Sequence, residues 1–401
     1  MNLEDLSKLA QPADTKIVLL VLDGLGGLPR QPGGHTELEE ADTPNLDRLA
    51  AEGTAGLIEP VGAGITPGSG AGHLGLFGYD PLRYTVGRGV LSALGIGFDL
   101  KSQDVAARGN FCTVDEKGRV TDRRAGRIDD DANRRLCERL KEIDVDGAEL
   151  HIETVREHRF LLVLRGDDLA GAIDDTDPQT TGEKPHEPKP RSDAAEPTSR
   201  IVADFLEKAR ELLADEEQAN MVLLRGFGQR PDWPSMWDTY GLRAAAIADY
   251  PMYRGVSRLV GMEVQDNEPG MEAHIETLRE RWDDFDFFFV HEKQPDSAGE
   301  DGDFDRRVTL FEEFDKLMPD LLELEPDVLI VTGDHSTPAV LSQHSWHPVP
   351  VLLHASTAMP DRVERFGERD CIGGGLGPRL PAWKLMRLAM AHAGRLEKFG
   401  A

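Results

Sequence analysis

The chain has 401 residues, of which 39% are hydrophobic and 29% charged, and this length and composition predict a globular protein of two domains. A formal net charge of −28 argues against general nucleic-acid binding, which needs a basic face, and suggests a high-salt cytoplasm. No apolar run approaches the roughly 18 residues of a membrane helix, the acidic start of the chain lacks an apolar signal core, and three isolated cysteines (Cys112, Cys137 and Cys371) favour a reducing cytoplasm.

The first predicted element is a buried parallel strand over Lys16–Leu22, which is followed at once by Asp23-Gly24. Open α/β sheets place ligand-binding groups at the carboxyl ends of such strands. Asp-Gly is also a common turn pair, so this feature alone leaves a plain strand-ending turn open. A helix with Pro44 near its first turn and a second strand over 54–60 follow.

A glycine-rich stretch, Val61–Pro81, holds Ser69 in its middle. Glycines at this density let the backbone approach a ligand closely. A helix beginning near Ala71 would turn backbone N–H groups and the positive end of its dipole toward an anion at Ser69. A flexible surface loop remains an alternative for this stretch taken alone.

From about Lys101 the chain changes to short strands, turns and many arginines. Guanidinium groups bind phosphate and carboxylate in a bidentate manner, so these arginines are candidates for an anion site; charge balance against nearby acids is the alternative. Asp177–Arg200 predicts a long loop, Ile201–Asp215 an amphipathic helix and Met221–Leu224 a strand. Residues from about 100 to 240 therefore form a predicted second domain inserted into the first. The arginines are Arg108, Arg119, Arg123, Arg124, Arg127, Arg156, Arg159 and Arg165.

The first domain then resumes with a strand, loop and helix over Arg243–Gly261. Three more buried strands are expected over Phe285–Val290, Pro326–Val331 and Val349–Leu353.

Acids and histidines follow several of these strands: Asp23, Asp296 with Glu300, Asp334 with His335, and the pair His344 and His347 before the last strand. Asp296 and Glu300 are four residues apart, which places both on one face of a helix. Carboxylates and imidazoles gathered at strand ends suit Mn²⁺ or Zn²⁺, whereas Mg²⁺ prefers oxygen ligands. Each pair also has a structural explanation, but together they predict a two-metal site.

These segments carry a family resemblance. Val21–Gly24, Pro67–His73, Asp296–Glu300, Thr332–Pro338 and His344–Pro350 resemble the cofactor-independent phosphoglycerate mutases, in their archaeal-type branch, within the alkaline phosphatase superfamily. The likeness runs nearly end to end. It implies an alkaline-phosphatase-like α/β fold, with a mostly parallel sheet sandwiched by helices (1–100 and 241–401) and a smaller inserted α+β substrate-binding domain (101–240).

The resemblance also implies roles for single residues. Ser69 would be the nucleophile that becomes phosphoserine. One metal would be held by Asp23, Ser69, Asp334 and His335, and the other by Asp296, Glu300 and His344. The family more often has histidine where this chain has Glu300, so an oxygen ligand stands in place of a nitrogen ligand. The substrate-binding arginines would be Arg108, Arg124, Arg127, Arg159 and Arg254.

The expected activity is interconversion of 3-phosphoglycerate and 2-phosphoglycerate, independent of 2,3-bisphosphoglycerate, with two divalent cations. Mn²⁺ is the expected metal, and Mg²⁺, Zn²⁺ and Co²⁺ stay open. Metal coordination would activate the serine hydroxyl, and arginines on a hinged domain would retain glycerate. A metal-dependent phosphomonoesterase or another phosphomutase on the same core is the first alternative, and a non-enzymatic binding protein is the second.

Overall fold

The computed structural model describes residues 3–400, and the chain divides into two compact units. Unit 1 joins the chain up to Thr85 with the chain from Pro234 onward, and unit 2 is Val86–Trp233. Both junctions precede the positions, 100 and 240, expected from the sequence. The first junction lies earlier because α5 (Arg88–Gly95) packs on β3 (Val105–Val114) and β7 (Met221–Gly228) and so belongs to unit 2. The sequence shows the apolar face of this helix but not the strands on which it packs.

Unit 1 is built on an eight-stranded sheet in the order β13-β2-β12-β11-β1-β10-β8-β9. Only β12 runs antiparallel to its neighbours. The central strands are mostly apolar and all their residues are buried, so both faces of the sheet are covered. The strands are β1 (Ile17–Leu22), β2 (Thr54–Glu59), β8 (Ala244–Ile247), β9 (Glu263–Val264), β10 (Phe287–Glu292), β11 (Val328–Thr332), β12 (Val349–Ala355) and β13 (Gly377–Pro381).

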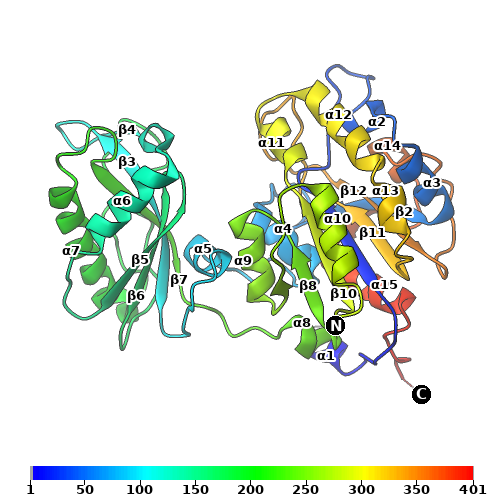
Figure 1. The fold of residues 1–401 in the computed structure, drawn as a ribbon, viewed down its shortest axis with the longest axis horizontal. Coiled ribbons are helices and arrows are strands. Elements are labelled where there is room, and N and C mark those ends of the chain that lie inside the picture. Colours follow the sequence, from blue (N-terminus) through cyan, green and yellow to red (C-terminus); the bar gives the residue numbers. More distant parts are fainter. Residues whose placement is uncertain (1–2, 401) are drawn as a thin grey trace. The chain divides into compact units, whose positions relative to one another are not determined.

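Helices pack on this sheet as Figure 1 shows: α3 contacts β12 and β2, α10 contacts β10 and β8, and α15 contacts β11. The α helices of unit 1 are α1 (Leu3–Ser7), α2 (Glu37–Glu40), α3 (Pro44–Glu52), α4 (Ser69–Leu76), α8 (Met236–Tyr240), α9 (Pro251–Leu259), α10 (Met271–Glu280), α11 (Gln294–Glu300), α12 (Phe304–Asp315), α13 (Met318–Leu322), α14 (Glu368–Cys371) and α15 (Leu385–His392), with a 3-10 turn η3 (Ala382–Lys384).

Unit 2 is an α+β unit with a wholly antiparallel five-stranded sheet, in which β3 pairs with β4, β6 and β7, and β6 pairs with β5. Its helices α6 and α7 contribute Leu136, Phe205 and other apolar side chains to one core with the strands. Besides β3 and α5, the elements are β4 (Val120–Asp122), η1 (Ala125–Arg127), α6 (Asp130–Leu140), β5 (Glu149–Arg156), β6 (Arg159–Arg165), η2 (Asp193–Ala195), α7 (Glu196–Leu212) and β7 (Met221–Gly228).

The predicted α/β class is confirmed: a mostly parallel sheet with helices, interrupted by a smaller α+β unit. The helix predicted near Ala71 begins at Ser69, and the helix predicted over Ile201–Asp215 is Glu196–Leu212. Within residues 3–400, no helix combines the length and the apolar character needed to cross a bilayer.

Candidate metal centre and anion site

The candidate metal residues are brought together by the ends of neighbouring parallel strands in unit 1. Asp23 follows β1, and Asp334 and His335 follow β11, which is the partner of β1 on one side. On the other side, β10 leads into α11, whose first turn carries Asp296. Parallel strands end at the same edge of a sheet, so three segments that are far apart in the sequence converge there.

Asp23, Asp334 and His335 form the first group of possible metal ligands, and all three are fully buried. His335 Nε2 lies 3.2 Å from Asp23 Oδ1 and 3.2 Å from Asp334 Oδ2. Within residues 3–400, neither of these carboxylate oxygens has a hydrogen-bond donor. A buried charged oxygen without a partner is costly, and a divalent cation at this point would satisfy both.

The hydrogen bonds of Thr337 indicate which nitrogen of His335 is available to a metal. Thr337 Oγ1 donates its single proton to Asp296 Oδ1 at 2.6 Å and lies 3.0 Å from His335 Nδ1. In the neutral imidazole, Nδ1–H must then donate to Thr337, which leaves Nε2 unprotonated. An unprotonated nitrogen facing two carboxylate oxygens is the donor set of a metal site, so these residues fit a divalent cation.

Asp296, His335 and His344 form the second group, which shares His335 with the first. His344 Nε2 lies 3.6 Å from Asp296 Oδ1, and the two imidazole rings stack with centroids 3.7 Å apart. Glu300, at the last position of α11, reaches within 3.8 Å of His344 Nε2, but its side chain is 56% exposed, against 1% for Asp296. Glu300 therefore lies at the rim of this group, and His347 does not join it.

Ser69 lies at the first position of α4, after the glycine-rich loop, and its Oγ is 3.3 Å from His335 Nε2. The hydroxyl is thus beside the imidazole that both groups share. Buried His73, one turn along α4, lies 2.8 Å from the carbonyl oxygen of Ser69 through Nδ1, and the same nitrogen is 3.2 Å from Asp334 Oδ2. Burial lowers the pKa of His73, but the charges of Asp334 and Asp23 and the carbonyl oxygen of Ser69 together outweigh burial, so the pKa is raised overall.

Asp23 has neighbours that the sequence patterns did not single out. Its Oδ2 accepts a hydrogen bond from the Tyr253 hydroxyl and lies 3.4 Å from His291 Nε2 and 3.1 Å from Lys293 Nζ. Burial favours the protonated acid, yet Lys293 and the two histidines His291 and His335 hold the pKa of Asp23 well below its usual value. Asp23 is therefore an anion, as a metal ligand must be.

The four arginines predicted to bind substrate in unit 2 all act electrostatically on one buried histidine, His158. Burial, followed by the charges of the four arginines, lowers the pKa of His158 to about 4, so it is neutral near pH 7. Two further arginines extend this arginine cluster, because burial and then the charge of Arg225 lower the pKa of Arg88. Such a concentration of positive charge fits an anion. The four predicted arginines are Arg108, Arg124, Arg127 and Arg159.

Backbone strain also marks this cluster. Ala125, Gly126 and Arg127 all have positive φ, of 46°, 65° and 55°, and a non-glycine residue pays roughly 1–2 kcal/mol for that conformation. Asp122 holds the turn, because its carboxylate accepts from the backbone N–H of Arg124 at 2.8 Å and of Gly126 at 2.6 Å. Strain of this kind gathers at ligand sites.

Arg254, the predicted substrate residue of unit 1, lies on α9 directly after Tyr253. Its Nη2 is 3.1 Å from Asp266 Oδ1, and Asp266 is fully exposed, so this ion pair contributes little energy.

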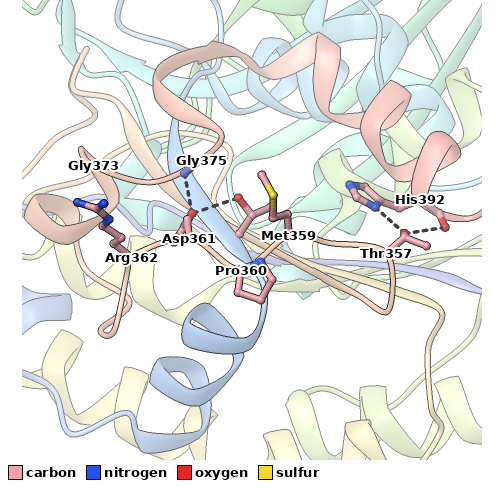
Figure 2. A pocket seen from close by; sticks show the side chains of 9 residues that line it. Thr357, Met359, Pro360, Asp361, Arg362, Gly373, Gly375 and His392 are labelled. Carbon is pink, nitrogen blue, oxygen red and sulfur yellow. Dashed lines mark hydrogen bonds between the residues drawn. The ribbon is translucent and has the colours of Figure 1, made fainter.

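A separate surface cavity of about 660 Å³, shown in Figure 2, contains none of these residues. Asp361 lies in its wall, and the two oxygens of this carboxylate already accept hydrogen bonds from backbone N–H groups of Ala55, Gly375 and Val363. The wall thus offers no unsatisfied acid, and we place no chemistry there.

The fold and the site define an α/β protein with a candidate metal centre beside a serine at the carboxyl edge of its sheet. Residues 50–219 match the family described as 2,3-bisphosphoglycerate-independent phosphoglycerate mutase. A relative from Thermus thermophilus, named a probable 2,3-bisphosphoglycerate-independent phosphoglycerate mutase, is 52% identical over 99% of this chain and 98% of its own length.

Two solved structures are also similar. A Pyrococcus horikoshii protein is 30% identical with a TM-score of 0.83, covering 96% of this chain and 99% of that one. The cofactor-independent phosphoglycerate mutase of Thermoplasma acidophilum is 30% identical with a TM-score of 0.69, covering 94% and 100%. This chain belongs to the 2,3-bisphosphoglycerate-independent phosphoglycerate mutase family.

Proposed function

We propose that this protein interconverts 3-phosphoglycerate and 2-phosphoglycerate through a phosphoserine at Ser69, without 2,3-bisphosphoglycerate. The observation that carries the proposal is the position of Ser69 Oγ, 3.3 Å from the imidazole shared by two groups of metal-ligating side chains, in a chain 52% identical to a relative named for this activity.

The proposed reaction consists of two phosphoryl transfers. In the first, Ser69 Oγ gives up its proton and forms a bond to phosphorus while the bond from phosphorus to the 3-oxygen breaks, and the 3-oxygen takes up a proton. In the second, the 2-hydroxyl of glycerate gives up its proton and forms the bond to phosphorus while the bond from phosphorus to Ser69 Oγ breaks, and Ser69 Oγ takes up a proton. Substrate and product are isomers, so nothing is consumed.

Asp23, Asp334 and His335 would hold one divalent cation, with Ser69, and Asp296, His344 and Glu300 the other. Bound cations would lower the pKa of the serine hydroxyl and stabilise charge on the transferred group. Carboxylate and imidazole donors together favour Mn²⁺, with Zn²⁺, Co²⁺ and Mg²⁺ as further candidates. The buried cysteines, none of them paired, support a reducing cytoplasm as the place of action.

The arginine cluster would bind the carboxylate of the substrate and retain glycerate between the two transfers. Guanidinium groups bind a carboxylate through charge-assisted hydrogen bonds, and six of them in one region can hold the glycerate anion. Retention of glycerate separates a mutase from a hydrolase. A metal-dependent phosphomonoesterase on the same centre is the competing function. Arg254 is proposed as a further substrate contact.

The decisive experiment is turnover of 3-phosphoglycerate with MnCl₂ and without 2,3-bisphosphoglycerate, followed by ³¹P NMR. We expect 2-phosphoglycerate to form faster than free phosphate, and Ser69→Ala to lose the activity. Ser356→Ala, at an exposed serine after β12, is the matched control. Faster release of phosphate would identify a hydrolase, and a fully active Ser69→Ala would remove the nucleophile.

A further inference from the structure

The Lys293 side chain connects the two groups of metal-ligating residues. Its ammonium lies 3.1 Å from Asp23 Oδ2 and also contacts Asp296 Oδ2. Asp23 belongs to the group with Asp334, and Asp296 belongs to the group with His344. One positive charge, supplied by the chain itself, therefore bridges one carboxylate of each group.

The two oxygens of each carboxylate have different neighbours. In Asp23, Oδ1 faces His335 Nε2 at 3.2 Å, whereas Oδ2 contacts Lys293. In Asp296, Oδ1 faces His344 Nε2 at 3.6 Å, and Oδ2 again contacts Lys293. Lys293 thus contacts Oδ2 of both acids, and Oδ1 of each acid faces an imidazole.

The two acids need this charge when no divalent cation is present. Asp23 and Asp296 are both 0% exposed, and buried carboxylates that share a site repel each other and resist ionisation. Tyr253 and His291 also touch Asp23 Oδ2, but neither carries the permanent charge of a lysine, and within residues 3–400 neither makes a hydrogen bond or an ion pair with Asp296. In that part of the chain, Lys293 is the only side chain that forms an ion pair with Oδ2 of both acids.

We propose that Lys293 is an internal counter-ion of the metal centre, a positioning residue that keeps Asp23 and Asp296 in place without metal and lowers the affinity of the centre for divalent cations. The inference rests on the proposed function in so far as both groups bind such cations. A fixed positive charge next to the ligands repels an incoming cation. Lys293 therefore lowers the affinity for the cation while it keeps the two carboxylates in place before the cation binds.

The test compares Lys293→Met with the parent, with Lys293→Arg and with Lys316→Met. Lys316 is an exposed lysine at the end of α12 in the same unit and controls for the loss of one surface charge. Melting temperatures are measured in EDTA and in saturating MnCl₂, and Mn²⁺ binding is measured by isothermal titration calorimetry. Lys293→Gln, whose amide can still donate one hydrogen bond, takes the place of the methionine variant if that variant does not fold.

We expect Lys293→Met to melt several degrees below the parent in EDTA and within about a degree of it in MnCl₂, and to bind Mn²⁺ at least tenfold more tightly. Lys293→Arg should behave as the parent. An equal loss of melting temperature in both buffers, or Mn²⁺ binding that is unchanged or weaker, would overturn the proposal. A parent that binds no Mn²⁺ would overturn the proposed function instead, while the melting temperatures in EDTA would still test the counter-ion.

Discussion

A buried ion pair beneath the candidate metal centre allows a quantitative prediction. Arg307, on α12, is fully buried and pairs with Glu37 on α2, with Nη1 2.8 Å from Glu37 Oε1. The same guanidinium donates to the carbonyl oxygens of Thr337 at 2.7 Å and Gly24 at 2.6 Å. Gly24 follows Asp23 and Thr337 follows His335 by two residues, so Arg307 fastens together both loops that carry the first group of ligands.

Replacing Arg307 with methionine leaves Glu37 as an uncompensated buried charge, which typically costs about 3–5 kcal/mol. The Glu37 carboxylate still accepts hydrogen bonds from the backbone N–H groups of Ala339 at 2.8 Å and Leu28 at 3.1 Å. These two hydrogen bonds reduce the loss of stability. The carbonyl oxygens of Thr337 and Gly24 each lose the hydrogen bond from the guanidinium, which adds about 1 kcal/mol for each. We therefore expect the free energy of unfolding of unit 1 to fall by about 4 kcal/mol, a large part of a typical domain's stability.

Urea unfolding followed by tryptophan fluorescence measures this change, because Trp237, Trp282, Trp346 and Trp383 lie in unit 1 and only Trp233 lies in unit 2. Arg306→Met is the control, since the neighbouring Arg306 makes an exposed ion pair with Glu313 worth under about 1 kcal/mol. Adding Glu37→Gln to Arg307→Met should recover at least about 1 kcal/mol. If Arg307→Met lowers the free energy of unfolding no more than Arg306→Met does, Arg307 does not hold together the two loops that carry Asp23 and His335.

Three further predictions concern pH, metal preference and substrate binding. Burial raises the pKa of Glu368, which accepts hydrogen bonds from Thr36 Oγ1 and Gly27 N–H, to about 7 from 4.5. Between these two pH values the folded state binds more protons than the unfolded state. The free energy of unfolding of the parent should therefore fall by up to about 3 kcal/mol from pH 4.5 to 7, relative to that of Glu368→Gln. If the unfolding free energies of the two proteins, measured by urea unfolding, follow parallel pH profiles, the prediction is wrong. Glu300→His should keep turnover but shift its preference from Mn²⁺ toward Zn²⁺ in metal-replacement assays, and an identical metal order would place Glu300 outside the centre. Arg124→Ala should raise KM about tenfold or more with a smaller change in kcat, since a guanidinium–carboxylate hydrogen bond contributes about 1.5–3 kcal/mol; an unchanged KM in initial-rate assays would exclude Arg124 from substrate binding.

Much of the metal centre was predictable because its residues follow strands that are individually recognisable. Leu22-Asp23 and Thr332-Gly333-Asp334 each end a run of apolar residues, and parallel strands in one sheet must end at a common edge. The sequence therefore predicts Asp23 and Asp334 at the same edge of the sheet, whereas their closeness depends on the pairing of β1 with β11. The helical spacing of Asp296 and Glu300 was equally visible, whereas the exposure of Glu300 depends on where α11 ends, which the spacing does not determine.

The arginine cluster was only partly predictable. Arg124 and Arg127 stand out by density in the sequence, but Arg88 and Arg225 come from α5 and β7, which flank unit 2 at either end. Antiparallel pairing of β3 with β7 sets Arg108 opposite Arg225. This pairing joins residues more than a hundred positions apart, and no local pattern of a single sequence specifies it.

The same limit explains why Lys293 escaped detection although it lies three residues before Asp296. The register of β1 on β10 sets Leu22 beside Glu292, and the backbone N–H of Asp23 donates to the carbonyl oxygen of Glu292 at 2.9 Å. The next residue along each strand is therefore an acid on β1 and a lysine on β10, side by side at the sheet edge. Shifting the register by one residue would turn either side chain to the opposite face. The contact on which the counter-ion depends is thus a property of strand pairing, and for that reason it can be tested by substitution at Lys293 but could not be inferred from the charge pattern around it.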